Sequence, residues 1–518
     1  MIQNSKNSIR VVLLVTAAVL VGVFIGRHYR LGQTSSFQKG LFMQSGSKID
    51  QVLRMVGKEY VDTLDTDSLT EMAIVNLLAQ LDPHSVYMPP VDYSSFNSEM
   101  EGKFDGIGVE FNIVRDTVVV VHVLSGGPAS KVGMQDGDRI VDVEGESIAG
   151  IGIKNSDVVS KLRGEKGSKV ALRVYRPRLK KEIDFVLTRG AIPVYSVENA
   201  IMLNKETGII QVSRFIENTH RDFAKALKDL KKKGMQNLIV DLRGNGGGYL
   251  NEATKMADEF LDSGVITYTQ GAHRKRTDYM ANRGGLFEKG KLVVLIDESS
   301  ASASEVLAGA IQDHDRGLIV GRTSFGKGLV QEVLKLPDAS AIRLTIARYY
   351  TPSGRSIQRP YSMDKWSYYQ QGLSGMHSDS VPTKSESFFT KGGREVFEAG
   401  GIQPDHKVET DTSEITDAIF GLWQTGILYE VAFDLADNNR NVEKIPTDLD
   451  AQILAAIAQK QGEAQKYNAS EKQFIILQTK RLMARNLDHK SGITKYILQS
   501  DKDIQEALKA LENYNLNY

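Results

Sequence analysis

The chain has 518 residues, 41% hydrophobic and 25% charged, which is the composition of a folded globular protein with room for about three domains. The 64 Lys and Arg residues balance the 64 Asp and Glu residues. There is thus no basic excess to attract nucleic acid, and we exclude nucleic acid as a partner. The sequence contains no cysteine, which excludes disulfides, thiolate metal sites and a cysteine nucleophile. Any covalent catalysis must therefore use another residue.

Residues 1–30 contain an apolar stretch, Ile9 to Ile25, with basic residues near both of its ends. As a helix this stretch would cover about 26 Å of hydrocarbon, which suffices for a membrane span if the basic side chains reach the interface. No small-residue cleavage pattern follows Ile25, so the sequence favours a retained signal anchor over a cleaved signal peptide. We therefore expect the protein to bind a membrane through this segment.

Residues 45–100 predict a small helical lead-in. Apolar residues recur at helical spacing over residues 49–60 and again over residues 72–81, where Asp82 and Pro83 end the second run.

Residues 101–190 change to short β-rich runs separated by glycine-rich turns. One short helix is predicted at Ser156–Leu162. The five predicted strands are residues 107–111, 118–124, 139–143, 170–175 and 183–187. This pattern indicates a compact β-rich module.

Strands and helices alternate over residues 191–410, as in an α/β core with a largely buried sheet. The predicted strands are residues 209–215, 238–242, 292–296, 317–320 and 341–349, and the predicted helices are residues 219–233, 250–261 and 303–312. Residues 361–390, rich in Ser, Tyr and Gln, are interpreted as an inserted surface loop. Residues 411–518 are predicted to form a separate helical region.

A candidate nucleophile follows the buried strand 292–296, in the stretch Ser-Ser-Ala-Ser302-Ala-Ser-Glu305. The hydroxyl of Ser302 would emerge at the open end of the sheet. There the next helix supplies free N–H groups and a positive dipole for an oxyanion. The competing interpretation is that these serines only cap the helix.

A candidate general base lies in the stretch Phe-Gly-Lys327-Gly. A lysine can serve as the base for a serine only if burial lowers its pKa, and flanking glycines would let the backbone pack closely enough to bury it. Gln331, four residues further on, is placed to hydrogen-bond the amine. The competing interpretation is an ordinary exposed loop lysine.

A glycine-rich loop, Arg243-Gly-Asn245-Gly-Gly-Gly-Tyr249, follows the strand 238–242. Successive glycines can direct several N–H groups at one point, which suits an anion or an oxyanion. The loop lacks the Lys-Ser/Thr of a Walker motif and the spacing of a dinucleotide fingerprint, so nucleotide binding is rejected.

Other catalytic groups find less support. His314 is the histidine nearest to Ser302 in the sequence, and it is expected past the end of the same helix, facing away. Spacing alone still leaves a Ser-His-Asp triad open. No ligand spacing of the metallohydrolase kind appears, so neither a metal nor another cofactor is expected.

Together these motifs resemble the carboxyl-terminal processing peptidases, also called tail-specific proteases. The resemblance covers about residues 50–410 and rests on Ser-Ala-Ser302-Ala-Ser-Glu305, Phe-Gly-Lys327-Gly-x-x-Gln331, Asp241-Leu-Arg243-Gly-Asn245 and Leu81-Asp-Pro-His84-Ser. It implies a serine endopeptidase that cleaves through an acyl-enzyme.

The resemblance also implies roles for single residues. Ser302 takes the position of the nucleophile, Lys327 that of the general base and Gln331 that of the residue that orients the base. The backbone N–H groups of Ala303 and of the glycine pair around Gly247 match the oxyanion-hole positions. Many members of the family have proline where this chain has glycine at position 246.

The β-rich module resembles a PDZ domain, with Gly106-Ile107-Gly108-Val109 in the position of the carboxylate-binding loop. This resemblance implies that a peptide tail adds as a strand beside residues 107–111 while loop N–H groups hold its terminal carboxylate. Substrates would then be proteins or peptides with accessible C-termini.

The expected fold is thus an α/β multi-domain chain: a helical N-terminal lead-in, a PDZ β-rich module, an α/β serine-peptidase core and a helical C-terminal region. The resemblance further implies a membrane-anchored enzyme with its catalytic body outside the cytoplasm, in the bacterial periplasm, and it is compatible with an oligomer or an adaptor. Two alternatives stay open, namely a non-catalytic PDZ scaffold and an esterase or amidase that acts on small molecules.

Overall fold

The computed structural model describes residues 47–124, 126–361, 367–369, 386–398, 400–409, 416–439, 448–461, 467–486 and 497–514. The predicted anchor at residues 1–30 lies outside these residues and stays a prediction. Among the helices described, none is long and apolar enough to cross a membrane. The chain divides into two compact units, one ending at Leu81 and one beginning at Asp82.

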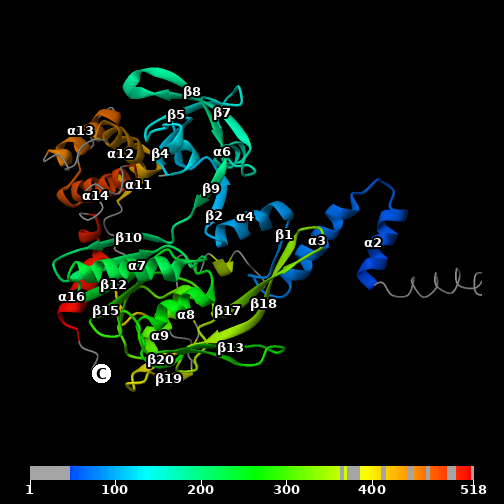
Figure 1. Cartoon of the computed structure of the whole chain (residues 1–518), viewed down its shortest axis with the longest axis vertical. Helices are drawn as coiled ribbons and strands as arrows, with labels where there is room; N and C mark the ends of the chain where they lie inside the picture. Colours follow the sequence, from blue (N-terminus) through cyan, green and yellow to red (C-terminus); the bar gives the residue numbers. More distant parts are fainter. Residues whose placement is uncertain are drawn as a thin grey trace, which may run out of the picture. The chain divides into compact units, whose positions relative to one another are not determined.

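The first unit contains helices α2 (Lys48–Glu59) and α3 (Thr66–Ala79), drawn in blue in Figure 1. Each begins at a side chain that accepts a backbone N–H of the first turn, Ser47 for α2 and Asp65 for α3. These are the helices predicted for the lead-in.

The β-rich module is an antiparallel sheet in the second unit. Its strands are β3 (Val109–Val114), β4 (Thr117–Val123), β5 (Arg139–Val143), β6 (Glu146–Ser147), β7 (Lys169–Arg176) and β8 (Lys181–Thr188), in the order β3-β4-β5-β7-β8 with β6 paired to β5. Helices α5 (Pro128–Lys131) and α6 (Asn155–Leu162) complete it. The two-residue β6 and four-residue α5 were not predicted, because elements this short carry no readable period.

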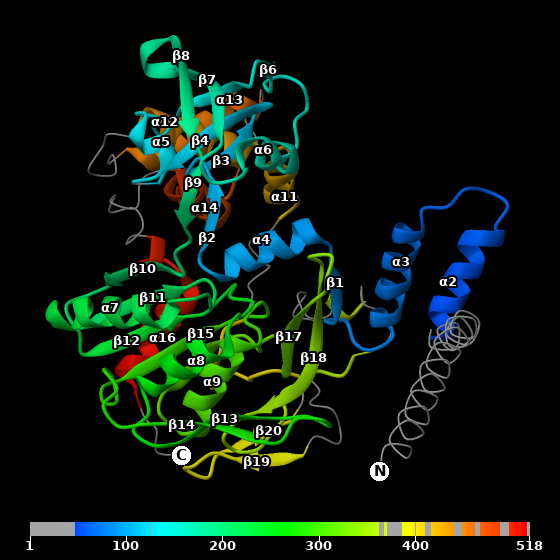
Figure 2. The same cartoon turned by 45° about the vertical axis from the view of Figure 1, so that its right-hand side comes forward.

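Two paired strands connect this module to the rest of its unit. Strand β2 (Lys103–Gly106), which follows helix α4 (Pro90–Met100), runs antiparallel to β9 (Gly190–Pro193), as Figure 2 shows. The chain therefore enters and leaves the module side by side.

The α/β core is built on a six-stranded sheet. Its strands are β10 (Val197–Met202), β11 (Thr207–Val212), β12 (Asn237–Asp241), β15 (Leu292–Ile296), β16 (Leu318–Gly321) and β21 (His406–Lys407), in that order across the sheet. Strand β10 is antiparallel to β11, and all other neighbours are parallel. The carboxyl ends of the parallel strands thus meet at one edge, where loops can gather side chains.

Both faces of this sheet are covered. The covering helices are α7 (Thr219–Lys232), α8 (Leu250–Asp258), α9 (Ala303–Asp313) and α16 (Lys502–Glu512). Val240 packs in one core with residues of α7, α8 and α9, while its neighbour Ile239 packs in another with Ile504 and Leu511 of α16. Successive residues of a strand face opposite sides, so α16 covers the face that the other three helices leave open.

The position of α16 differs from the prediction that residues 411–518 form a separate region. Four helices do form their own bundle, namely α11 (Asp417–Gln424), α12 (Ile427–Asn438), α13 (Leu449–Gln461) and α14 (Ala469–Asn486). The last helix instead returns to the core, because Ile504, Ala507 and Leu511 form an apolar stripe that the sheet buries.

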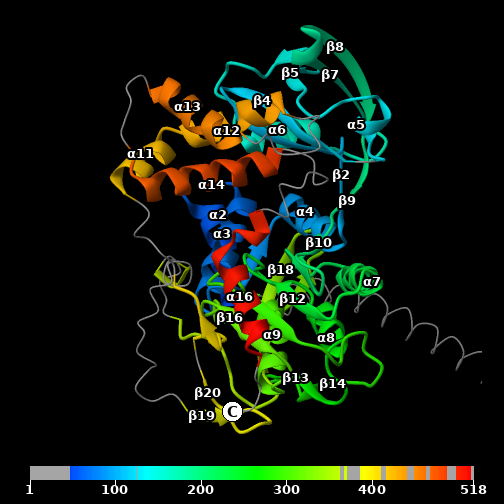
Figure 3. The ribbon, with the colours of Figure 1, turned by 90° about the vertical axis from the view of Figure 1, so that its left-hand side faces the viewer.

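The bundle also contacts the β-rich module (Figure 3). Phe433 of α12 is buried with Val114 and Val119. An ion pair joins Arg115 to Asp434 at 2.8 Å.

A second sheet supplies one wall of the site described below. It contains β1 (Val86–Met88), β13 (Gly264–Gln270), β14 (Thr277–Ala281), β17 (Leu329–Lys335) and β18 (Ala341–Tyr350), in the order β1-β18-β13-β14 with β17 paired to β18. Strands β19 (Ser387–Phe389) and β20 (Glu395–Phe397) form a separate hairpin.

Candidate active site

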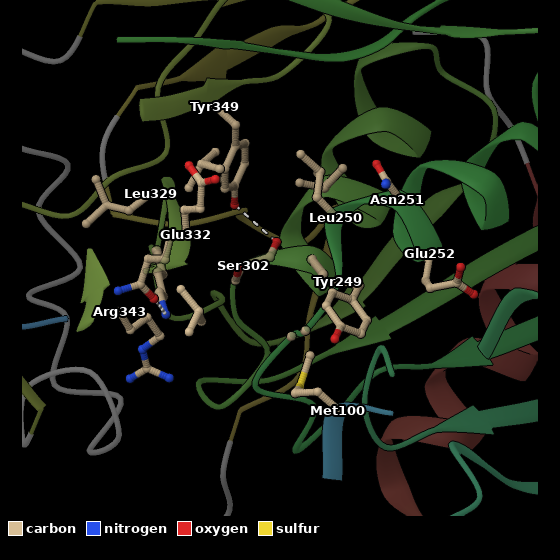
Figure 4. A pocket seen from close by; sticks show the side chains of 18 of the residues that line it. Met100, Tyr249, Leu250, Asn251, Glu252, Ser302, Leu329, Glu332, Arg343 and Tyr349 are labelled. Atoms are coloured by element: carbon tan, nitrogen blue, oxygen red, sulfur yellow. Dashed lines mark hydrogen bonds between the residues drawn. The ribbon is translucent and has the colours of Figure 1, made fainter. Parts of the chain in front are cut away.

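Ser302 stands between β15 and α9, immediately before the first helical residue. Its backbone has φ 55° and ψ −112°, a sparsely populated conformation that costs about 1–3 kcal/mol and persists only when its surroundings hold it. The N–H of Ser302 donates to Glu305 Oε2 at 2.7 Å, and its carbonyl accepts from Tyr349 Oη at 3.2 Å (Figure 4). These contacts hold the turn that presents the side chain to a cavity of about 990 Å³.

Lys327 lines the same cavity, and its amine is poorly hydrated. Burial, together with the charge of Arg343, lowers the pKa of Lys327 to about 8. Its Nζ donates to Gln331 Oε1 at 2.9 Å, and no carboxylate of the described residues forms an ion pair with it. The amine can therefore lose its proton at mildly alkaline pH.

Gly326 and Gly328 allow the close packing around Lys327. Gly326 has φ 85°, and a Cβ there would lie 3.1 Å from the backbone N of Gly401. At Gly328 a Cβ would lie 3.0 Å from the backbone N of Gln358. A larger residue at either position would push the backbone away.

Gln331 is fixed at both ends of its amide. It belongs to β17, and while Oε1 accepts from Lys327, Nε2 donates to the main-chain oxygen of His84 at 2.6 Å. The His84 ring is buried, with Nε2 3.1 Å from Tyr368 Oη and Nδ1 3.1 Å from Tyr369 Oη. Burial and the charge of Lys327 lower the pKa of His84 to about 3, so the ring is neutral.

Glu305 connects the loops that carry the two candidate catalytic residues. Its buried carboxylate accepts the backbone N–H groups of Ser302, Gly326 and Lys327 and the hydroxyl of Ser324. Burial raises the pKa of Glu305. No role for Glu305 was predicted, although the Ser-x-x-Glu spacing of a capping box was a signal for one.

The glycine-rich loop lies directly against Ser302. Gly247 has φ 100°, and a Cβ there would lie 2.8 Å from Ser302 Cβ and 2.7 Å from Ala301 O, so the position requires glycine. The N–H of Gly247 donates to Asn245 Oδ1 at 2.9 Å, which corrects the expectation that it is free for an oxyanion. The reason is local, since an Asn side chain readily bonds the backbone two residues further on.

Other N–H groups at the cavity have no acceptor among the described residues, among them those of Ala303, Gly246 and Gly248. Ala303 is the first residue of α9, where no intrahelical acceptor exists. Gly248 forms a parallel bridge with Phe215 that uses the carbonyl of Gly247 and the N–H of Tyr249. The N–H of Gly248 therefore points away from Phe215.

The cavity thus brings together Ser302, Lys327, Gln331, Ala303 and the glycine loop. No hydrogen bond joins Ser302 Oγ to Lys327 Nζ in the structure described, where the amine is bound to Gln331 instead.

A triad with His314 is not formed. His314 follows the last residue of α9, and its Nε2 lies 2.8 Å from the main-chain oxygen of Val265. The His314 ring is therefore hydrogen-bonded at a place away from Ser302, as its position in the sequence predicted.

The predicted carboxylate-binding loop connects β2 to β3. Gly106 ends β2, Ile107 is buried in the core of the module, Gly108 has φ 79°, and Val109 begins β3. In the part of the chain that the structure describes, β3 pairs only with β4. Its other edge can therefore accept an added strand.

Comparisons with known proteins show two family matches and several similar proteins. Peptidase family S41 matches residues 206–362, and the PDZ domain family matches residues 106–188. Carboxy-terminal processing protease CtpB of Bacillus subtilis is 37% identical over 317 residues, which are 60% of this chain and 65% of that protein. The carboxy-terminal-processing protease of Bartonella bacilliformis is 36% identical over 319 residues, 60% of this chain and 72% of that protein. Among solved structures, the photosystem II D1 C-terminal processing protease is 28% identical with a TM-score of 0.36, and the match covers 71% of this chain and 91% of that one.

Proposed function

Because the chain belongs to the carboxy-terminal processing proteases, serine peptidases of family S41 with a PDZ domain, we propose that it cleaves proteins near their carboxyl ends with a Ser302/Lys327 dyad. Membership in a peptidase family favours this function over a non-catalytic scaffold and over a small-molecule esterase. The observation that carries the dyad is the Lys327 amine, which lies buried and without a carboxylate partner in the cavity that Ser302 lines.

In the proposed reaction, neutral Lys327 accepts the proton of Ser302 as Oγ attacks a peptide carbonyl, and the ammonium then gives this proton to the leaving amine. Water, deprotonated by the same amine, hydrolyses the ester and releases Ser302. A neutral amine can donate to Gln331 Oε1 while its lone pair accepts the proton of Ser302, so Gln331, held by the main chain of His84, would orient the base.

The oxyanion would be stabilised by the N–H of Ala303, at the positive end of α9, and by the glycine loop. Since Asn245 occupies the N–H of Gly247, we assign the second donor to Gly248, which has no other acceptor among the described residues. Gly247 would contribute only after Asn245 releases it.

The loop from Gly106 to Val109 and the open edge of β3 would bind the C-terminal tail of the substrate. The apolar stretch from Ile9 to Ile25 would anchor the enzyme in a membrane, with the catalytic body outside the cytoplasm, in the bacterial periplasm.

Replacing Lys327 by Arg tests the dyad. Arginine keeps the positive charge but cannot lose its proton, so cleavage of a protein substrate should fall at least about 1,000-fold, as in Ser302→Ala. The melting temperature should stay close to that of the wild type. Lys228→Arg, on the exposed face of α7, is the matched control and should cleave normally. A purified Lys327→Arg protein that cleaves at the wild-type rate would exclude Lys327 as the base.

A further inference from the structure

Arg343 contributes a second cation to the wall of the catalytic cavity. It belongs to β18, where it pairs with Val86 of β1 and Val333 of β17, and its side chain lines the cavity with Ser302 and Lys327 (Figure 4). Because β18 is paired on both sides at Arg343, its backbone is held in place, and the side chain starts from a fixed position in this wall.

The guanidinium has no anionic partner among the described residues. No carboxylate forms an ion pair with it, and its Nε is buried without a hydrogen-bond acceptor. The Phe96 ring lies 5.7 Å from the guanidinium carbon, and the Lys327 amine carries charge of the same sign. An arginine keeps its charge under all physiological conditions, and leaving such a charge poorly solvated costs free energy that a bound anion would offset.

Three acidic residues line the cavity, Glu217, Glu252 and Glu332, and none of them forms an ion pair with Arg343. Glu332 pairs with Arg274 at 2.6 Å, and Glu252 pairs with Lys255 at 2.8 Å. Among the described residues no carboxylate is paired with the guanidinium of Arg343, and in a peptidase cavity a bound substrate can supply one.

We propose that Arg343 forms a carboxylate subsite that selects substrates with an acidic group close to the cleaved bond. This inference rests on the proposed function of the cavity and names the class of substrate that the enzyme would prefer, namely peptides with a carboxylate near the cleaved bond. The carboxylate has two sources on a peptide, an Asp or Glu side chain and the free C-terminus, and a guanidinium binds both in the same bidentate way.

The test compares matched peptides within each enzyme, so that any effect of Arg343 on Lys327 cancels in the ratio. One series carries Glu or Gln in turn at each position within about four residues of the cleaved bond, and a second ends in a free acid or an amide. At one position or at the C-terminus, wild-type enzyme should show a kcat/KM about tenfold higher for the acidic peptide, as expected for a charge-assisted hydrogen bond. Arg343→Gln should bring this ratio close to one, and Arg343→Lys should keep part of it. The series that shows the preference identifies the source of the carboxylate.

Arg348→Gln provides the matched control, since Arg348 lies on the same strand but is exposed and does not line the cavity. Its ratio should equal that of the wild type. Binding of the same peptides to Ser302→Ala, with and without Arg343→Gln, provides a second readout that needs no turnover. Wild-type enzyme that cleaves neither series would contradict the proposed function, while the binding ratio would still decide the role of Arg343. A preference that is absent, or that survives Arg343→Gln in both readouts, would overturn the subsite.

Discussion

The charge state of Lys327 should determine how cleavage depends on pH. Below its pKa of about 8 the amine holds a proton and cannot accept the one from Ser302, so kcat/KM should rise about tenfold per pH unit up to that value and level off above it. Arg343 lowers this pKa because a neighbouring cation disfavours the ammonium form. Removing that cation in Arg343→Gln should therefore raise the pKa and move the midpoint to higher pH. Arg343→Lys retains the charge and should leave the midpoint in place, and an unmoved midpoint in Arg343→Gln would contradict the assignment of the titrating group.

Glu305 should be required for the geometry of both catalytic loops. A glutamine in its place keeps the size but offers one acceptor oxygen, whereas Glu305 uses two to accept four hydrogen bonds. We expect Glu305→Gln to lower the free energy of unfolding by about 2–3 kcal/mol and to reduce cleavage severely. Denaturant unfolding and kcat measure the two effects. Glu298→Gln, which removes a partly exposed pair with Arg322, is the control, and equal losses in both variants would show that the central position of Glu305 is unimportant.

The bond of Lys327 to Gln331 in the candidate site was predicted from the sequence, whereas the other hydrogen bonds of the site were not. The position of Ser302 after a buried strand and of Lys327 between glycines follows from local patterns. The bond from the N–H of Gly247 to Asn245, and the meeting of four donors at Glu305, depend on loops that approach one another only in the folded chain. No periodicity or spacing reports such contacts.

At the scale of single elements, the segment 367–369 should support the catalytic base through His84. Tyr368 and Tyr369 hold the neutral ring, and the main chain of His84 holds Gln331. Replacing both tyrosines by phenylalanine keeps the aromatic packing but removes the two hydrogen bonds to His84, together with the bond of Tyr368 to Gln358 and that of Tyr369 to the main-chain oxygen of Pro83. We expect kcat to fall about three- to tenfold with little change in KM, because the base becomes less well positioned while the rest of the cavity is intact.

Tyr361→Phe is the control for this double variant, because Tyr361 packs against Tyr368 without a hydrogen bond to His84. Its kcat should match the wild type. A double variant that keeps full kcat, or that changes KM alone, would show that the hydrogen bonds to His84 do not help to position Lys327.

The same segment shows where prediction from the sequence ends. Residues 361–390 were interpreted as a surface loop because they are polar and lack a period. In the described part, Tyr368 is buried and contacts His84, which lies 284 positions earlier in the chain. Contacts between residues so far apart leave no local pattern. By contrast, four strands of the core sheet (β11, β12, β15 and β16) and helices α7, α8 and α9 were predicted close to their observed positions, whereas β10 and β21 were not predicted.

For the whole molecule, the α/β multi-domain fold and the family were predicted from the sequence and are confirmed. The position of α16 was not predicted. Its apolar stripe indicates that the helix packs against another element but does not identify that element. The observed position links α16 to the candidate active site. Asp501 and Asp503, at the start of α16, bind Arg243, which precedes the glycine loop.

This link predicts that the C-terminal helix supports catalysis from a distance. Arg243 Nη1 lies 2.8 Å from Asp501 and 2.9 Å from Asp503, and its side chain is only 16% exposed, so solvent screens these pairs weakly. In the double variant Asp501→Asn/Asp503→Asn, Arg243 keeps Asp241 alone. We expect the free energy of unfolding to fall by about 1–3 kcal/mol, less than for a buried charge left without any partner, and cleavage to fall as the glycine loop loses its anchor.

Chemical unfolding and kcat/KM on one protein substrate test this prediction. Glu506→Gln removes a surface pair with Lys509 on the same helix and should change stability by less than about 0.5 kcal/mol, with normal cleavage. If the double variant loses stability but keeps wild-type kcat/KM, α16 covers the sheet without supporting the loop. If it loses neither, the contacts of Arg243 with α16 contribute nothing measurable, and the apolar stripe alone holds the helix in place.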